Sequence, residues 1–229
     1  MFHPINRKHF ERFMKLKNLH HFFEELVLKA AKKKNISGFY SDRFLPGQQI
    51  KTNWFAITGP PCAGKTTVLN AMENQGFPVI HERGRFVIES ALAEGFTTEE
   101  IFANQQLLQE TILKTKIIAH LENPVQRLTF LEDGIPESLA YFRIENLEMP
   151  QFMSNFDVFR YQKIFYLEAL PLLNDPARPH NQEKIDHLGE MKKQVHFELG
   201  YDVIEIPALT VEERVKMIRT FLNNDGNQE

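Results

Sequence analysis

Residues 59–67 combine two glycines, a lysine and two threonines at a spacing that can bind phosphate. They read Gly-Pro-Pro-Cys-Ala-Gly-Lys-Thr-Thr and match the pattern G-x-x-x-x-G-K-[ST] at every fixed position. In such a loop the glycines let backbone N–H groups turn toward phosphate, Lys65 neutralises the β- and γ-phosphates, and the Thr66 hydroxyl is a magnesium ligand. The predicted nucleotide-binding residues are Gly59, Pro60, Pro61, Cys62, Ala63, Gly64, Lys65, Thr66 and Thr67.

Charged side chains follow two other apolar segments. Glu132 and Asp133 come after the segment 128–131. A carboxylate beside a phosphate loop can hold magnesium through water or align the nucleophile, so Glu132 is the first candidate for a metal-binding and catalytic acid and Asp133 the second. The alternative is that both are capping or solvated acids.

Glu82 and Arg85 follow the segment 77–81. Such an acid–base pair could fix a hydroxylated substrate and accept its proton, with a structural salt bridge as the alternative. We therefore expect Glu82, Arg85 and Asp133 to bind substrate, with Glu82 also catalytic.

A third candidate is Arg178, in the proline-containing segment 174–180 before a polar helical segment. An arginine in a lid over the nucleotide could stabilise the charge on a transferred phosphoryl group. The alternative is an exposed surface arginine, with Arg160 as a weaker candidate for the same role. The histidines lack the spacing of metal ligands, and we expect them to be surface or packing residues.

These residues need a framework of alternating strands and helices. A β-prone run, 53–58, precedes the phosphate loop, and a helical pattern, 67–74, follows it. Further predicted strands are 77–81, 128–131, 163–167 and 201–206, and further predicted helices are 84–94, 97–121, 181–199 and 211–222. Thr97 with Glu100 and Thr210 with Glu213 form capping boxes. Right-handed crossovers then predict an α/β fold, with a five-stranded parallel sheet, helices on both faces and ligands at the carboxyl ends of the strands.

The N-terminal segment differs from the rest of the chain in charge. Residues 1–50 contain ten Lys and Arg against four Asp and Glu, whereas residues 51–229 contain 17 against 26. Apolar residues between positions 9 and 31 recur at helical spacing. We expect residues 1–50 to form a basic helical extension and linker, and residues 51–229 to form the nucleotide-binding domain. The helix either packs on the domain or lies on a membrane or partner surface.

Composition excludes several classes of protein. With 229 residues and 42% hydrophobic side chains, the chain resembles a globular protein. Its apolar runs are far shorter than the roughly 20 residues of a membrane-spanning helix. The single cysteine excludes an intrachain disulfide and favours a cytoplasmic location. The acidic charge of residues 51–229 speaks against a nucleic-acid-binding core.

Four segments together resemble a known family. These are residues 57–67, 81–89, 132–141, and 175–178 with 200–207. The chain from Trp54 to Leu222 resembles the P-loop NTPase family of AAA-domain-like ATPases related to the nicotinamide riboside kinase domain of the bacterial NAD-biosynthesis regulator. This resemblance implies a kinase-like fold, ATP or GTP with Mg²⁺, and an acid plus an arginine in an acceptor pocket. Where the family usually has Asp-Arg-Gly, this chain has Glu132-Asp133-Gly134, with Glu137 in place of a second aspartate.

Two functions follow as hypotheses. The first is a Mg²⁺-dependent kinase acting on a small hydroxylated metabolite or nucleoside-like acceptor. The second is a nucleotide-switched binding protein whose N-terminal helix engages a membrane or protein partner. The absence of an Asn-Lys-x-Asp run, with which GTPases read guanine, favours ATP, and GTP is the alternative.

Overall fold

The computed structural model describes residues 7–32, 49–153, 155–170 and 182–224. Its centre is a parallel five-stranded sheet in the order β3-β4-β2-β6-β7. The strands are β2 (Trp54–Thr58), β3 (Val79–Ile80), β4 (Thr129–Glu132), β6 (Lys163–Leu167) and β7 (Val203–Ile206). The predicted parallel α/β sheet is confirmed. A separate two-residue pairing joins β1 (Ile50–Lys51) to β5 (Phe159–Arg160), which the sequence pattern did not predict.

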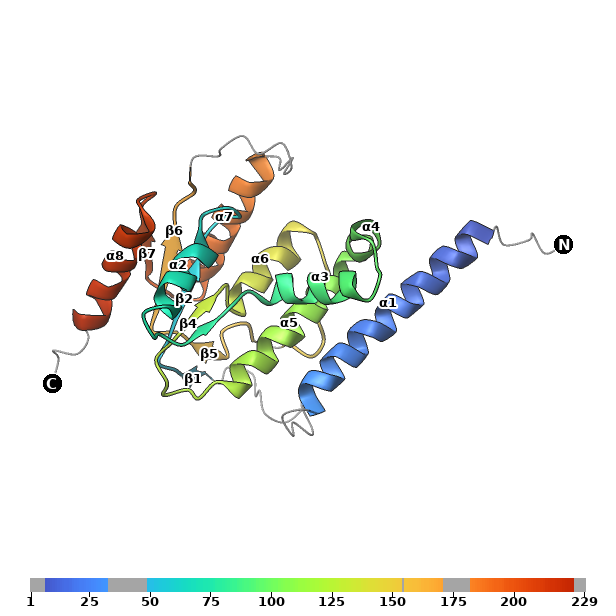
Figure 1. Cartoon of the computed structure of the whole chain (residues 1–229), viewed down its shortest axis with the longest axis horizontal. Helices are drawn as coiled ribbons and strands as arrows, with labels where there is room; N and C mark the ends of the chain where they lie inside the picture. Colours follow the sequence, from blue (N-terminus) through green and yellow to red (C-terminus); the bar gives the residue numbers. More distant parts are fainter. Residues whose placement is uncertain (1–6, 33–48, 154, 171–181, 225–229) are drawn as a thin grey trace.

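Alternation along β2 decides which helices cover which face of the sheet (Figure 1). Trp54 and Ala56 pack with residues of α5 (Gln105–Glu122), α6 (Pro136–Ile144) and α7 (Gln182–Glu198). Phe55 and Ile57 pack on the other face with α2 (Lys65–Glu73) and α8 (Val211–Asn224). The sheet is therefore buried on both sides, as parallel sheets generally are.

The predicted helix 97–121 is wrong in one respect, because it is two helices. The segment divides into α4 (Thr98–Phe102) and α5, and the break lies where Asn104 accepts a 3.0 Å hydrogen bond from the backbone N–H of Leu107. Asn104 is thus an N-cap that starts a new helix. Both predicted capping boxes are confirmed, Thr97 with Glu100 and Thr210 with Glu213. The helix α6 was not predicted, although Pro136 suits a first helical turn.

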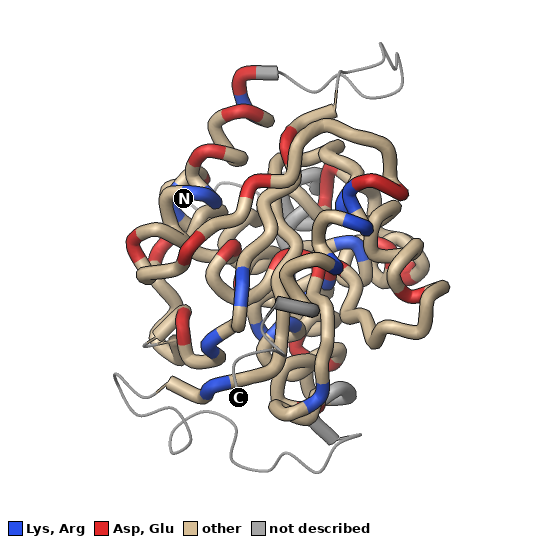
Figure 2. The backbone as a smooth tube through the Cα atoms, turned by 90° about the vertical axis from the view of Figure 1, so that its left-hand side faces the viewer, with Lys and Arg blue, Asp and Glu red and all other residues tan. Residues whose placement is uncertain are grey.

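The N-terminal helix α1 (Arg7–Lys32) lies against α5, α4 and α3 (Arg83–Ala93) (Figure 1). Leu19, Phe23 and Val27 of α1 are buried. The Lys15 Nζ lies 2.6 Å from a carboxylate oxygen of Glu100 in α4. None of the described helices is long and apolar enough to cross a membrane. In the view of Figure 2, Lys and Arg are interspersed with Asp and Glu along the backbone.

Candidate nucleotide and acceptor site

The phosphate loop connects β2 to α2 and depends on two glycines. Gly59 has φ +139°, and a Cβ there would lie 2.4 Å from the carbonyl oxygen of Leu167. Gly64, with φ +79°, is the N-cap of α2. Both positions require the conformational freedom of glycine. The loop leads directly into a helix N-terminus, where backbone N–H groups and the helix dipole favour an anion.

Lys65 lies within this loop. Its Nζ donates to the carbonyl oxygens of Gly59, at 3.2 Å, and Pro60, at 3.0 Å. Burial lowers the pKa of Lys65, and the nearby Asp133 carboxylate opposes that shift. The Lys65 side chain is thus held against the backbone of the loop.

The two predicted magnesium ligands are in contact. Thr66 Oγ1 donates a 2.5 Å hydrogen bond to Glu132 Oε1. Glu132 is the last residue of β4, and burial raises the pKa of its carboxyl group. A hydroxyl and a carboxylate are the hard oxygen donors that Mg²⁺ prefers, and Mg²⁺ commonly takes its other ligands from water and phosphate. This pair of side chains therefore fits the ion, although the described residues contain no cluster of three or more His, Cys, Asp or Glu that could form a complete metal cage.

Asp133 is held by a cation that the sequence pattern did not single out. It adopts φ +50° directly after β4, accepts a 3.0 Å hydrogen bond from Thr58 Oγ1, and accepts a 2.6 Å hydrogen bond from Lys192 of α7. Burial raises the pKa of Asp133, but Lys192, Lys65 and Lys116 outweigh this effect and hold it well below its usual range. Asp133, which stands where the family described above usually has an arginine, is thus neutralised by the surrounding lysines.

The segment after Asp133 is fixed by a buried hydrogen-bond network. Lys116 of α5 donates to the Gly134 carbonyl at 2.8 Å, and the Ile135 N–H donates to the Tyr161 hydroxyl at 3.1 Å. A Cβ at Gly134 would lie 2.3 Å from that hydroxyl. His120 Nε2 lies 2.8 Å from the same hydroxyl. This network fixes the segment that leads from Glu132 and Asp133 into α6.

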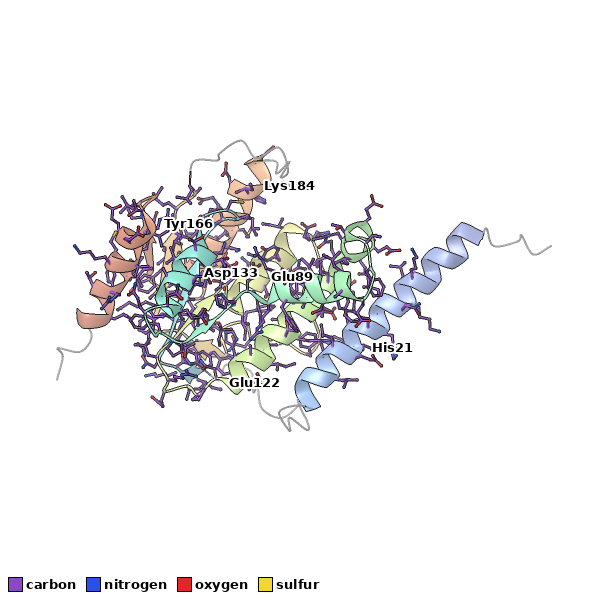
Figure 3. The ribbon with its side chains drawn as sticks, in the orientation of Figure 1. His21, Glu89, Glu122, Asp133, Tyr166 and Lys184 are labelled. Carbon is purple, nitrogen blue, oxygen red and sulfur yellow. The ribbon has the colours of Figure 1, made fainter. Side chains whose placement is uncertain are left out.

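A cavity of about 470 Å³ opens beside these residues. Its apolar lining residues are Ile88, Phe102, Leu108 and Ile112, and its polar lining residues are Glu82, Arg85, Glu89, Gln109, Lys116 and Tyr141. Figure 3 labels Glu89 on α3 and Asp133 near the centre of the molecule. The backbone N–H of Glu82 donates to Glu132 Oε2 at 3.4 Å. Glu82 therefore links the cavity to the Thr66–Glu132 pair.

Comparison with known proteins identifies the family to which this chain belongs. A family model described as an AAA domain matches residues 54–214. The chain belongs to this AAA-domain family. The predicted family resemblance is thus confirmed, and α1 and β1 lie outside the matched part. A search of curated protein sequences finds no match.

Solved structures show that the AAA domain of this chain has a P-loop kinase fold. A deoxyadenosine kinase from M. mycoides, with products bound, superposes with TM-score 0.53 at 13% identity, covering 75% of this chain and 98% of the kinase chain. The thymidylate kinase from Candida albicans gives TM-score 0.51 at 14% identity, covering 80% of this chain and 94% of that chain. A NadR protein in complex with NR gives TM-score 0.49 at 16% identity, covering 67% of this chain and 45% of that one.

Within the AAA domain, the predicted site residues lie in two groups. Lys65, Thr66, Glu132 and Asp133 lie at the phosphate loop, and Glu82 and Arg85 line the cavity. Cys62 and Thr67 are exposed. Arg178 lies outside the described residues, and its role stays a prediction. Arg160, the weaker alternative, donates to Asp157 and to the Leu199 carbonyl.

Several site residues were missed by sequence reasoning. Gln109, Lys116 and Tyr141 line the cavity, Lys192 holds Asp133, and Arg214 donates to the Ala63 carbonyl of the phosphate loop at 2.6 Å. All five come from helices. Neither residue type nor spacing distinguishes them from surface residues of the same helices, so no sequence signal could have found them.

Proposed function

We propose that this protein is a Mg²⁺-dependent kinase that transfers the γ-phosphoryl group of ATP to a hydroxyl group of a small metabolite or nucleoside-like acceptor. The observation that carries the proposal is the position of Glu82. Its side chain lines the cavity, and its backbone N–H bonds to Glu132, which in turn contacts Thr66 of the phosphate loop. A cavity that opens beside a phosphate loop is what transfer between two bound molecules needs.

Each side chain has a distinct role in this proposal. Lys65 holds the β- and γ-phosphates, and Thr66 with Glu132 would hold Mg²⁺. The ion supplies charge neutralisation at the phosphates. The hydroxyl oxygen of the acceptor forms a bond to the γ-phosphorus, and Glu82 accepts the hydroxyl proton. At the same time the bond from the γ-phosphorus to the β–γ bridging oxygen breaks, and ADP leaves. Asp133 is 4% exposed and does not line the cavity, so it acts through its hydrogen bond to Lys192 and does not touch the acceptor, unlike the substrate-binding role expected from the sequence. Arg178 stabilises the charge of the moving group.

The size and lining of the cavity support a nucleoside-like acceptor. A volume of about 470 Å³ lies within the range of small-molecule sites. The apolar lining residues suit the faces of a planar ring, and Arg85 suits a polar substituent. Gln109 is only 7% exposed and has no hydrogen bond to another described residue. Because Gln109 lines the cavity, its amide can hydrogen-bond an acceptor that carries complementary polar groups.

The test is turnover with Mg²⁺ and ATP across adenosine, cytidine, thymidine, nicotinamide riboside, ribose and shikimate, followed by mass spectrometry of each acceptor. We expect a mass gain of one phosphate on one class of acceptor, and no gain with the Lys65→Ala variant. Thermal stabilisation by ATP without any phosphorylated acceptor would contradict the kinase proposal. That outcome would favour the nucleotide-switched alternative, in which the N-terminal helix engages a membrane or protein partner.

A further inference from the structure

The helix α1 and the cavity share one wall. Leu19 and Phe23 of α1 belong to a buried apolar cluster with Leu108 and Ile112 of α5. Leu108 and Ile112 also line the cavity. Leu108 and Ile112 thus belong both to the cluster that buries α1 and to the lining of the cavity. Because a close-packed interior transmits displacements, a shift of α1 would move this part of the lining.

The short helix α4 packs on α1 as well as on α3 and α5. Its Ile101 is fully buried in the same cluster, and its Glu100 carboxylate lies 2.6 Å from Lys15 Nζ. A helix of five residues has little stability of its own, so tertiary contacts must position it. The last residue of α4, Phe102, lines the cavity and is 42% exposed. Together with α3 and α5, α1 therefore contributes to the position of Phe102 in the cavity wall.

The nucleotide side of the molecule packs elsewhere. The helix that follows the phosphate loop buries Val68, Leu69 and Met72 against the sheet and α8, in a cluster that contains no residue of α1 among those described. The loop itself is bonded to Arg214 of α8 and Lys192 of α7. Among the described residues, α1 therefore packs near the proposed acceptor cavity and not near the phosphate loop.

We propose that α1 is a structural part of the acceptor site. It positions Phe102, Leu108 and Ile112, so that acceptor affinity depends on a helix outside the AAA-domain match whereas nucleotide affinity does not. The part of this inference that concerns acceptor affinity rests on the proposed kinase function. The inference also implies that the apolar side of α1 packs on the rest of this chain and not on a membrane or a separate partner.

The experiment compares three substitutions in α1 of the full chain. Phe23→Ala removes the buried ring, Phe23→Leu keeps most of the apolar volume, and Leu28→Ala is the matched control because Leu28 is 54% exposed on the same helix. For Phe23→Ala we expect the KM of the acceptor that the turnover panel identifies to rise about tenfold, because small displacements of positioning residues are costly. The ATP affinity should change less than twofold, and Phe23→Leu should restore most of the acceptor KM.

Hydrogen–deuterium exchange gives a second reading that needs no acceptor. In Phe23→Ala, exchange should accelerate in α4 and the first half of α5 and stay unchanged in α2. Equal acceleration everywhere, equal loss of ATP and acceptor affinity, or an unchanged acceptor KM would each overturn the inference. If no acceptor is phosphorylated, the kinase proposal has failed by itself. In that case, unchanged exchange in α4 of Phe23→Ala would still overturn this inference. Faster exchange confined to α4 and the first half of α5 would support the conclusion that α1 positions the cavity wall.

Discussion

Lys192 of α7 donates a 2.6 Å hydrogen bond to Asp133, the residue that directly follows β4. The two side chains are 1% and 3% exposed. Lys192 also donates to the Gly59 carbonyl at 3.3 Å, so one ammonium group joins α7, the end of β4 and the phosphate loop. The negative charge of Asp133 is thereby accommodated beside the proposed phosphate site.

Removing the Lys192 charge should destabilise the protein strongly. Lys192→Met leaves the buried Asp133 carboxylate without its closest cation, and breaking a buried pair typically costs about 3–5 kcal/mol of unfolding free energy. The control is Lys193→Met on the same helix, whose partner Glu205 is half exposed, and its cost should stay below about 1 kcal/mol. Urea unfolding of both variants measures the difference. Equal losses of unfolding free energy in the two variants would show that the buried Lys192–Asp133 pair stabilises the protein no more than the surface pair does.

Lys65→Ala should abolish nucleotide-dependent stabilisation. Without the ammonium group, the loop loses the charge that neutralises the β- and γ-phosphates. The wild-type protein at an ATP concentration of 100 Kd should gain about 2.7 kcal/mol, which thermal unfolding detects as a higher midpoint. The variant should show no shift at the same ATP concentration, while its midpoint without ATP provides the control for folding. A retained shift would contradict the assignment of this loop.

Glu82→Gln should lower kcat while ATP still binds. The amide keeps the shape of the side chain but cannot accept the acceptor proton, and loss of a general base typically costs about 10²–10⁴ in rate. Glu94→Gln is the control, because Glu94 is an exposed residue at the end of α3. Steady-state kinetics with the identified acceptor, together with ATP titration, checks the outcome. A kcat equal to that of Glu94→Gln would remove Glu82 from the mechanism.

His120 should make the protein less stable as the pH falls. Its Nδ1 lies 2.7 Å from the Lys116 carbonyl, which can only accept, so Nδ1 carries the proton and Nε2 accepts from the Tyr161 hydroxyl. Burial lowers the pKa of His120 from 6.5 to about 4. The unfolded chain therefore takes up a proton before the folded one does, and stability that is present above pH 6.5 is lost between pH 6.5 and about 4.

The measurement for His120 is urea unfolding at several pH values between 7 and 5. Relative to His120→Gln, which has no titrating group, the wild-type protein should lose about 1.4 kcal/mol per pH unit below pH 6.5. The comparison removes the contribution of the other histidines, because both proteins share them. Parallel stability curves for the two proteins would show that His120 is not held neutral.

The sequence by itself determined the features that local physics controls. The phosphate loop is one continuous segment, and its glycines, Lys65 and Thr66 act through backbone geometry that neighbouring residues set. The strands around it were predicted because apolar, β-prone runs are local, and the alternation of Trp54 and Phe55 is a property of any extended chain. Thr97 and Thr210 cap their helices through side chains three residues away, which is also a local interaction. Asn104 has the same local character, but the apolar pattern that runs through it concealed the start of a helix.

Only the tertiary structure decided which distant side chains complete the site. The strand order places β4 between β3 and β2, so Glu82, Glu132 and Thr66 meet at one edge although they lie far apart in the chain. Lys192 and Gln109 come from helices packed on that sheet, and a helical pattern shows which face is apolar but not which neighbour each polar residue meets. The charge of Asp133 shows the physical reason most directly. Read in sequence it is an uncompensated acid beside a phosphate loop, and only packing of α7 and α5 brings the lysines that neutralise it.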